Sequence, residues 1–167
     1  MNPEAAKTAA QFYLADFEME MKTTAGVIGA VPEDNLGYKP DEKSRTALEL
    51  CRHIVLEDEW LLNGVVNGEL PPPPDQSDAT GLMTPQQCIE YYNKNLPGVV
   101  ARAKSLSGDD LVRTVDLMGL IQMPAIGFLS MAVRHSVHHR GQLATYLRPM
   151  GGSVPSIYGP SADTPMG

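Results

Sequence analysis

The sequence predicts an all-α protein, a four-helix bundle of the up-down type with long connections. Four segments repeat their apolar residues every three or four positions, which is the period of an amphipathic helix. No segment alternates apolar and polar residues for long enough to build a sheet. The length of 167 residues fits one domain. We therefore expect a single four-helix-bundle domain over residues 1–152 and a proline-containing C-terminal tail over 153–167.

The first two helices are defined by their apolar stripes and by the residues that stop them. Residues 4–30 carry apolar side chains at steps of four and three, which predicts one long helix. The second helix is expected to begin at Ser44, as its N-cap, and to run to about Val66. Asn67-Gly68 then ends it. Prolines 71–74 lie in the long connection that follows, and we expect them to be extended.

The second half of the chain predicts two more helices with an ambiguous segment between them. Thr84 is an N-cap followed by proline, which predicts the start of the third helix. Pro97-Gly98 should kink or break this helix. Residues 105–122 fit a short extended piece or a poor helix equally well. The last helix is expected over 123–148, before a glycine pair.

The charge balance limits the partners that the protein can have. Lys and Arg number 13 and Asp and Glu number 20, so the net charge is −7. An acidic chain without a basic run binds phosphate backbones and anionic lipid surfaces poorly. We therefore expect a small-molecule substrate, with neither nucleic acid nor membrane as a partner.

Three features of the sequence predict a cytoplasmic protein. The first 20 residues are acidic and contain no unbroken apolar run, so we expect no signal peptide. The two cysteines, Cys51 and Cys88, fit reduced core residues better than a disulfide framework. The uncharged stretch between Asp116 and Arg134 contains glycine, glutamine and proline, so we interpret it as a buried core segment and not as a membrane span.

The histidines carry the strongest chemical signal. The chain has four, and three of them fall between positions 135 and 139. His135 and His139 are four residues apart, so on a helix they point the same way and could share one metal ion. His138 could pair with His135 at a spacing of three, but it cannot share an ion with His139. His53 lies on the apolar stripe of the second helix. Inward-facing histidines need partners, and these three would be satisfied by a shared ion or, alternatively, as ordinary core residues.

A set of three imidazoles predicts a site with an open position. Such sets are typical of catalytic and not of structural metal sites. Nitrogen ligands favour one divalent ion, Zn²⁺ or Ni²⁺ before Fe²⁺ or Mn²⁺. Glu57, one turn after His53, could orient an imidazole or act as a base. Gln142 shares the face of His139 and could bind a ligand or bridge helices. We take Glu57 and Gln142 as candidate catalytic residues.

The remaining polar residues near the histidines are expected to have no part in the site. Asp58 and Glu59 should point away from the face of His53 and be solvated. Arg140 and Arg148 are expected at the surface or at a helix end. Trp60 is expected in the core or at an interface.

Two motifs resemble those of the DinB/YfiT-like superfamily. The run His135-Ser136-Val137-His138-His139-Arg140-Gly141-Gln142-Leu143 resembles the signature of that family's last helix. The run Leu48-Glu49-Leu50-Cys51-Arg52-His53-Ile54, followed by Trp60, resembles the signature of its second helix. The resemblance covers about residues 8 to 150. It implies a four-helix bundle with an open tri-histidine metal site, whose ligands would be His53, His135 and His139, with His138 outside the set.

The resemblance also implies a range of activities. Some members transfer low-molecular-weight thiols such as bacillithiol or mycothiol, and others isomerise maleylpyruvate with a thiol cofactor. We therefore expect a metal-dependent enzyme in which the ion lowers the pKa of a bound thiol or water, for transfer to a small molecule or for its hydrolysis. A low-molecular-weight thiol would then be a second cofactor. The alternatives are a non-enzymatic metal-binding protein and an interaction module, for example a homodimer through exposed helix faces.

Overall fold

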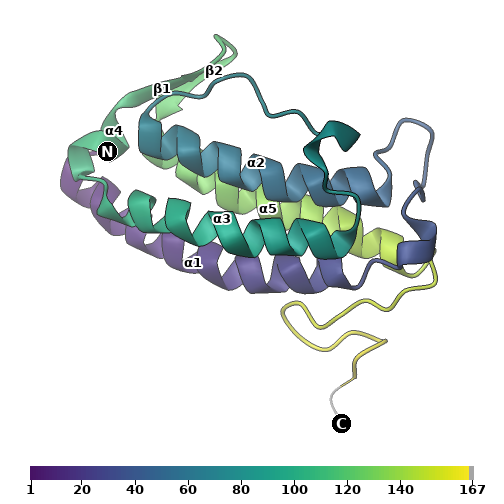
Figure 1. The fold of residues 1–167 in the computed structure, drawn as a ribbon. Helices are drawn as coiled ribbons and strands as arrows, with labels where there is room; N and C mark the ends of the chain where they lie inside the picture. Colours follow the sequence, from purple (N-terminus) through teal and green to yellow (C-terminus); the bar gives the residue numbers. More distant parts are fainter. Residues whose placement is uncertain (166–167) are drawn as a thin grey trace.

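The computed structural model describes residues 1–165, and four long helices make up most of it (Figure 1). They are α1 (Pro3–Gly29), α2 (Ala47–Asn67), α3 (Pro85–Ser105) and α5 (Ala125–Leu147). Each of α1 and α2 packs against both α3 and α5, so α1 and α2 lie diagonally across the bundle. The prediction of an all-α four-helix bundle with long connections is confirmed.

The directions of the helices refine the predicted up-down order. Helices α1 and α5 run from left to right in Figure 1, and α2 and α3 run from right to left, as the colours show. Contacts between α2 and α3 advance together along both helices, with Asp58 next to Tyr92 and Asn63 next to Arg102. These two helices are therefore parallel. The connection between them, residues 68–84, is long enough to return the chain along the whole bundle.

The ends of the helices follow from local capping. The side chain of Asn2 accepts a hydrogen bond from the backbone N–H of Ala5 and so caps α1. The N-cap of α2 is Thr46, two residues later than the predicted Ser44, because Thr46 and Glu49 form a reciprocal capping box. Gly68 ends it in the left-handed conformation, with φ of 80°. Thr84 caps α3 as predicted.

Helix α3 is continuous from Pro85 to Ser105, so a break at Pro97-Gly98 is wrong, and the predicted alternative of a kink stays a prediction. Proline removes one backbone hydrogen bond, the one that would go to the carbonyl of Asn93. Asn93 and Pro97 are both exposed, so water can satisfy that carbonyl. The buried face of the helix continues through Leu96 and Val99, and its packing holds the helix together.

The ambiguous segment contains both of its predicted structures. A short helix, α4 (Gly108–Val112), precedes an antiparallel hairpin of β1 (Thr114–Leu117) and β2 (Ile121–Pro124). The hairpin turns through Met118 and Gly119 with φ of 50° and 72°, as a type I′ turn requires. The extended piece was predicted, but its pairing into a two-stranded hairpin was not.

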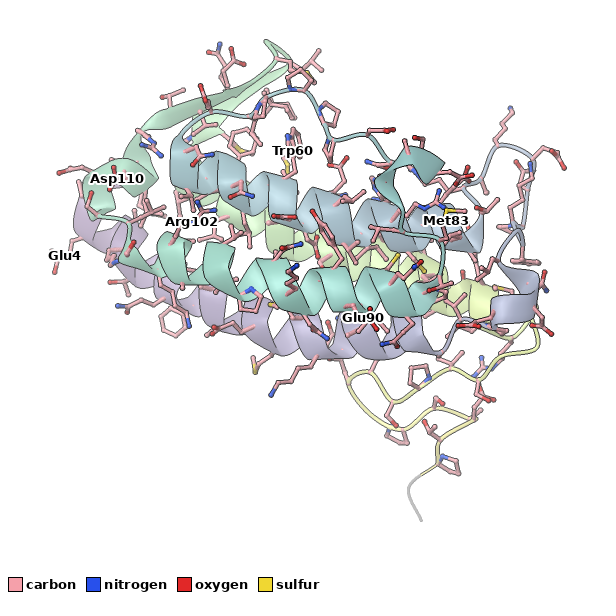
Figure 2. The ribbon with its side chains drawn as sticks, viewed as in Figure 1. Glu4, Trp60, Met83, Glu90, Arg102 and Asp110 are labelled. Carbon is pink, nitrogen blue, oxygen red and sulfur yellow. The ribbon has the colours of Figure 1, made fainter. Side chains whose placement is uncertain are left out.

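The proline run and the two cysteines pack against the helices. The indole N–H of Trp60 donates a hydrogen bond to the carbonyl of Pro71, which fixes the connection above α2 (Figure 2). Trp60 is half-buried there.

Cys51 and Cys88 are free and buried, as predicted for reduced core residues. Among residues 1–165, no helix is both long enough and apolar enough to cross a membrane.

The segment after α5 folds back over the bundle and contacts α1. Its residues Val154 and Ile157 pack against the core, and the hydroxyl of Tyr158 donates a hydrogen bond to Glu20. The prediction that Arg140 lies at the surface or at a helix end is wrong. Arg140 is 2% exposed and pairs with Glu20, because α5 turns this face toward α1. Arg148 is exposed, as expected. The division of the chain at residue 152 stays a prediction.

Candidate metal centre

Helices α2 and α5 bring three of the four histidines together. His53 comes from α2, and His135 and His139 come from consecutive turns of α5. The Nε2 atom of His53 lies 3.1 Å from that of His139 and 3.2 Å from that of His135. This group could hold a metal ion. His138 is exposed and its ring lies beside His139, outside the group, as its angular position on the helix predicts.

The outer nitrogen of each ring faces an oxygen of another side chain. The Nδ1 pairs are His53 with Gln76 Oε1 at 3.1 Å, His139 with Gln142 Oε1 at 3.0 Å and His135 with Asp58 Oδ1 at 3.4 Å. The orientation of the Gln76 amide follows from its other end, which donates to a Glu57 carboxylate oxygen at 2.6 Å. Oxygens of these types only accept, so each Nδ1 carries the proton and each Nε2 presents a lone pair to the centre.

The spacing of the three Nε2 atoms fits a shared cation. Two nitrogens bound to one zinc ion at about 2.0–2.1 Å lie about 2.9–3.4 Å apart at the usual angles. Lone pairs that face one another at 3.1 and 3.2 Å repel unless a positive charge lies between them. The three residues therefore fit a bound divalent ion, and each ring is oriented by its own oxygen partner, as in many metal sites.

Burial keeps two of these rings neutral. It is the largest cause that lowers the pKa of His53 to about 3, and the charges of His139 and Arg45 add to it. Burial likewise lowers the pKa of His139 to about 4, although the hydrogen bond that its Nδ1 donates to Gln142 opposes the shift. A metal ligand must be an unprotonated imidazole, so the surroundings select the binding form before any ion arrives.

The two predicted assisting residues lie at the site, but both act on it from outside. Glu57 is 8% exposed, and its carboxylate is 3.9 Å from His53 Nδ1. It holds Gln76, which in turn contacts His53. Burial raises the pKa of the Glu57 carboxyl. Gln142 bridges His139 and the hydroxyl of Tyr146, to which it donates a hydrogen bond at 3.1 Å.

The prediction that Asp58 is solvated is wrong. Asp58 is completely buried, accepts a hydrogen bond from the hydroxyl of Tyr92 at 2.7 Å and faces His135 with its other oxygen. Helix α2 is covered by α3 on one side and by α5 on the other, so its buried sector is wider than one stripe. The sequence did hold a signal, because all four residues three or four positions from Asp58 are apolar: Ile54, Val55, Leu61 and Leu62. Glu59 is half-buried and bonds to Tyr91.

Gln76 could not be found from the sequence. It lies in the irregular connection between α2 and α3, where no periodicity predicts which side chains turn inward. Its role depends on the path of this connection over α2.

We expect Asp58→Asn to weaken zinc binding by about 10–100-fold, the usual cost of losing an oxygen partner behind a metal-bound histidine. Asparagine keeps the volume, but its single oxygen cannot serve both Tyr92 and His135. Competition with a chromophoric chelator measures the affinity. Glu59→Gln is the control, since Glu59 bonds to Tyr91 and to none of the histidines. Equal zinc affinity in Asp58→Asn and the wild type would show that the carboxylate has no effect on His135.

Comparisons with known proteins agree with this architecture. A family model described as the DinB family matches residues 6–165. The uncharacterized protein YjoA of Bacillus subtilis strain 168 is 29% identical over 123 residues, which are 72% of this chain and 77% of that protein. The crystal structure of a DinB-like protein from Bacillus cereus ATCC 10987 has a TM-score of 0.72 at 23% identity, and the match covers 87% of this chain and 95% of that one.

A more distant structure extends the comparison to a characterised protein. The mycothiol-dependent maleylpyruvate isomerase has a TM-score of 0.57 at 15% identity, and the match covers 92% of this chain and 62% of that one. At this identity the similarity is one of fold. The family match over nearly the whole chain, with the long helices and the buried tri-histidine cluster, leads to one conclusion: the chain belongs to the DinB family.

Proposed function

We propose that this protein is a metal-dependent enzyme that activates a low-molecular-weight thiol for transfer to a small electrophile. The observation that carries the proposal is the convergence of three Nε2 lone pairs with every Nδ1 already engaged. Such a group binds an ion through three protein atoms. A structural zinc site normally has four protein ligands, whereas a catalytic site has three and keeps a position for substrate or water.

Among residues 1–165, no fourth protein ligand completes the group. Within the part of the chain that the structure describes, the cluster that could hold an ion consists of the three histidines alone. The carboxylate of Glu57 lies on the outer side of His53 and is held by Gln76. The nitrogen-only set favours Zn²⁺ or Ni²⁺, with Fe²⁺ and Mn²⁺ as weaker candidates.

The proposed reaction needs little from the protein beyond orientation. A divalent ion held by His53, His135 and His139 would supply a lower pKa to a thiol or water bound beside it. The thiol sulfur forms a bond to an electrophilic carbon, the leaving group departs with its electron pair, and the thiol proton passes to a base. Water is our candidate for that base, because Glu57 lies on the outer side of His53 and positions that ring through Gln76, as Gln142 positions His139. The name of the mycothiol-dependent isomerase supports thiol chemistry on this fold.

The test is thiol consumption with a chromogenic electrophile. Zinc- or nickel-loaded protein is incubated with 1-chloro-2,4-dinitrobenzene and with glutathione, cysteine or bacillithiol in turn. We expect turnover with at least one thiol, lost in His139→Ala and kept in His138→Ala. Activity that survives in His139→Ala would contradict the mechanism. If metal is bound but no thiol reacts, while p-nitrophenyl acetate is hydrolysed, water and not a thiol is the nucleophile. A loaded protein inactive in both assays would support the non-enzymatic alternative.

A further inference from the structure

Arg45 is held at the edge of the histidine cluster by a chain of hydrogen bonds. Its backbone carbonyl accepts from the hydroxyl of Tyr146 at 3.4 Å. That hydroxyl accepts from Gln142, and Gln142 contacts His139. Arg45 also precedes Thr46, the N-cap of α2. Its backbone is therefore tied to both helices that carry the histidines.

A surface cleft is lined by both Arg45 and Gln76, the residue whose amide contacts Nδ1 of His53. The cleft has a volume of about 350 Å³ and is lined by Lys43, Ser44, Arg45, Glu49, Gln76 and Ser77. Gln76 contributes to both the histidine site and the cleft. Its amide faces His53 and Glu57, and the residue also lines the cleft. A molecule bound in this cleft would therefore lie one side chain away from the histidines.

The guanidinium of Arg45 is exposed and has no carboxylate partner within residues 1–165. Four other arginines pair with carboxylates: Arg52 with Asp78, Arg113 with Asp110, Arg140 with Glu20 and Arg148 with Asp163. Glu49 also lines the cleft, but its carboxylate accepts from the backbone N–H of Thr46. In a chain of net charge −7, an arginine left free at this place is available for an external anion.

We propose that Arg45 binds the carboxylate of a small thiol whose sulfur reaches the three histidines, so that the substrate class is a carboxylate-bearing low-molecular-weight thiol. This inference rests on the proposed function, because it specifies the thiol that the site would use. Guanidinium groups bind carboxylates through two parallel hydrogen bonds, which also orient the bound molecule. Lys43, on the same cleft, adds to the positive charge.

The test measures binding and not turnover. Cobalt-substituted protein is titrated with 3-mercaptopropionate and 6-mercaptohexanoate, and with the methyl ester of each acid as its neutral match. Binding is followed by the sulfur-to-cobalt absorption band. We expect at least one acid to bind about tenfold more tightly than its ester, and Arg45→Gln to reduce that ratio to about one while the ester binds as before.

Arg102→Gln is the matched control. Arg102 bonds to Asn63, about 24 Å along α2 from Ala47, and Figure 2 shows it near the opposite end of α3 from Met83. It should keep the wild-type ratio, and the melting temperatures of all variants verify folding. If no thiol binds, the proposed function fails. If acids and esters bind equally, or if Arg45→Gln keeps the preference, thiol binding stands and the role of Arg45 is refuted.

Discussion

Alanine at position 139 is expected to reduce bound divalent metal from about one ion per chain to background. His139 supplies one of the three Nε2 atoms that converge in the described part of the chain, and even the loss of an oxygen partner behind a ligand lowers affinity about 10–100-fold. Removal of a ligand should therefore lower affinity by more than about 100-fold. The measurement is elemental analysis of untagged protein that has been purified without nickel resin, with circular dichroism to verify the helix content.

The adjacent residue offers a matched control. His138 is exposed and lies outside the cluster, so His138→Ala makes the same chemical change one position away and should keep the ion. His53→Ala should lose it as His139→Ala does, although it is on another helix. Equal metal contents in His138→Ala and His139→Ala would contradict the assignment. The absence of stoichiometric metal from the wild type would remove the basis of the proposed function.

Helical geometry predicted that His135 and His139 share a face, and the family resemblance implied that His53 joins them. A spacing of four places His135 and His139 on one face, whatever the rest of the chain does. His53 could be added because it interrupts the apolar stripe of its helix, and such a position faces inward in a bundle. The first argument uses only the period of the α-helix, whereas the inward position of His53 also needs the predicted bundle.

The residues that orient the rings were harder to predict, because their positions depend on packing between elements. Of two adjacent acids, the sequence favoured Glu57 over Asp58, since Glu57 is one turn from His53. In the structure Asp58 faces His135, whereas Glu57 acts through Gln76. A single apolar stripe predicts the buried residues of a helix that is covered on one side. Helix α2 is covered on two sides, by α3 and by α5.

The hairpin and the unbroken α3 also depend on more than local sequence patterns, so neither was predicted. The strands β1 and β2 have four residues each, too few for a period of two to be recognised. Pro97 predicts a break by its local chemistry, and the packing of the buried face overrides that preference. Capping predicted the start of α3 correctly because it depends on a few neighbouring residues.

Replacing Arg140 with methionine is expected to lower the free energy of unfolding by about 3 kcal/mol. Arg140 is 2% exposed and pairs with Glu20, whose side chain is 15% exposed, so the variant leaves a carboxylate largely buried without its cation. Breaking a buried ion pair from one side costs about 3–5 kcal/mol, and the hydroxyl of Tyr158 still donates to Glu20. The melting temperature should fall by about 6–12 °C. The measurement is made in a chelator, so that any change at the neighbouring His139 does not contribute.

A double variant separates the ion pair from the packing around it. Methionine fills much of the space of arginine, and Glu20→Leu removes the carboxylate that Arg140→Met would leave unpaired. Because desolvating two charges costs about as much as their attraction returns, Arg140→Met with Glu20→Leu should recover most of the lost stability. If the double variant is as unstable as Arg140→Met alone, the unpaired charge is not the cause. If neither variant changes the melting temperature, the pair between α1 and α5 contributes no measurable stability, and the burial of Arg140 would need another explanation.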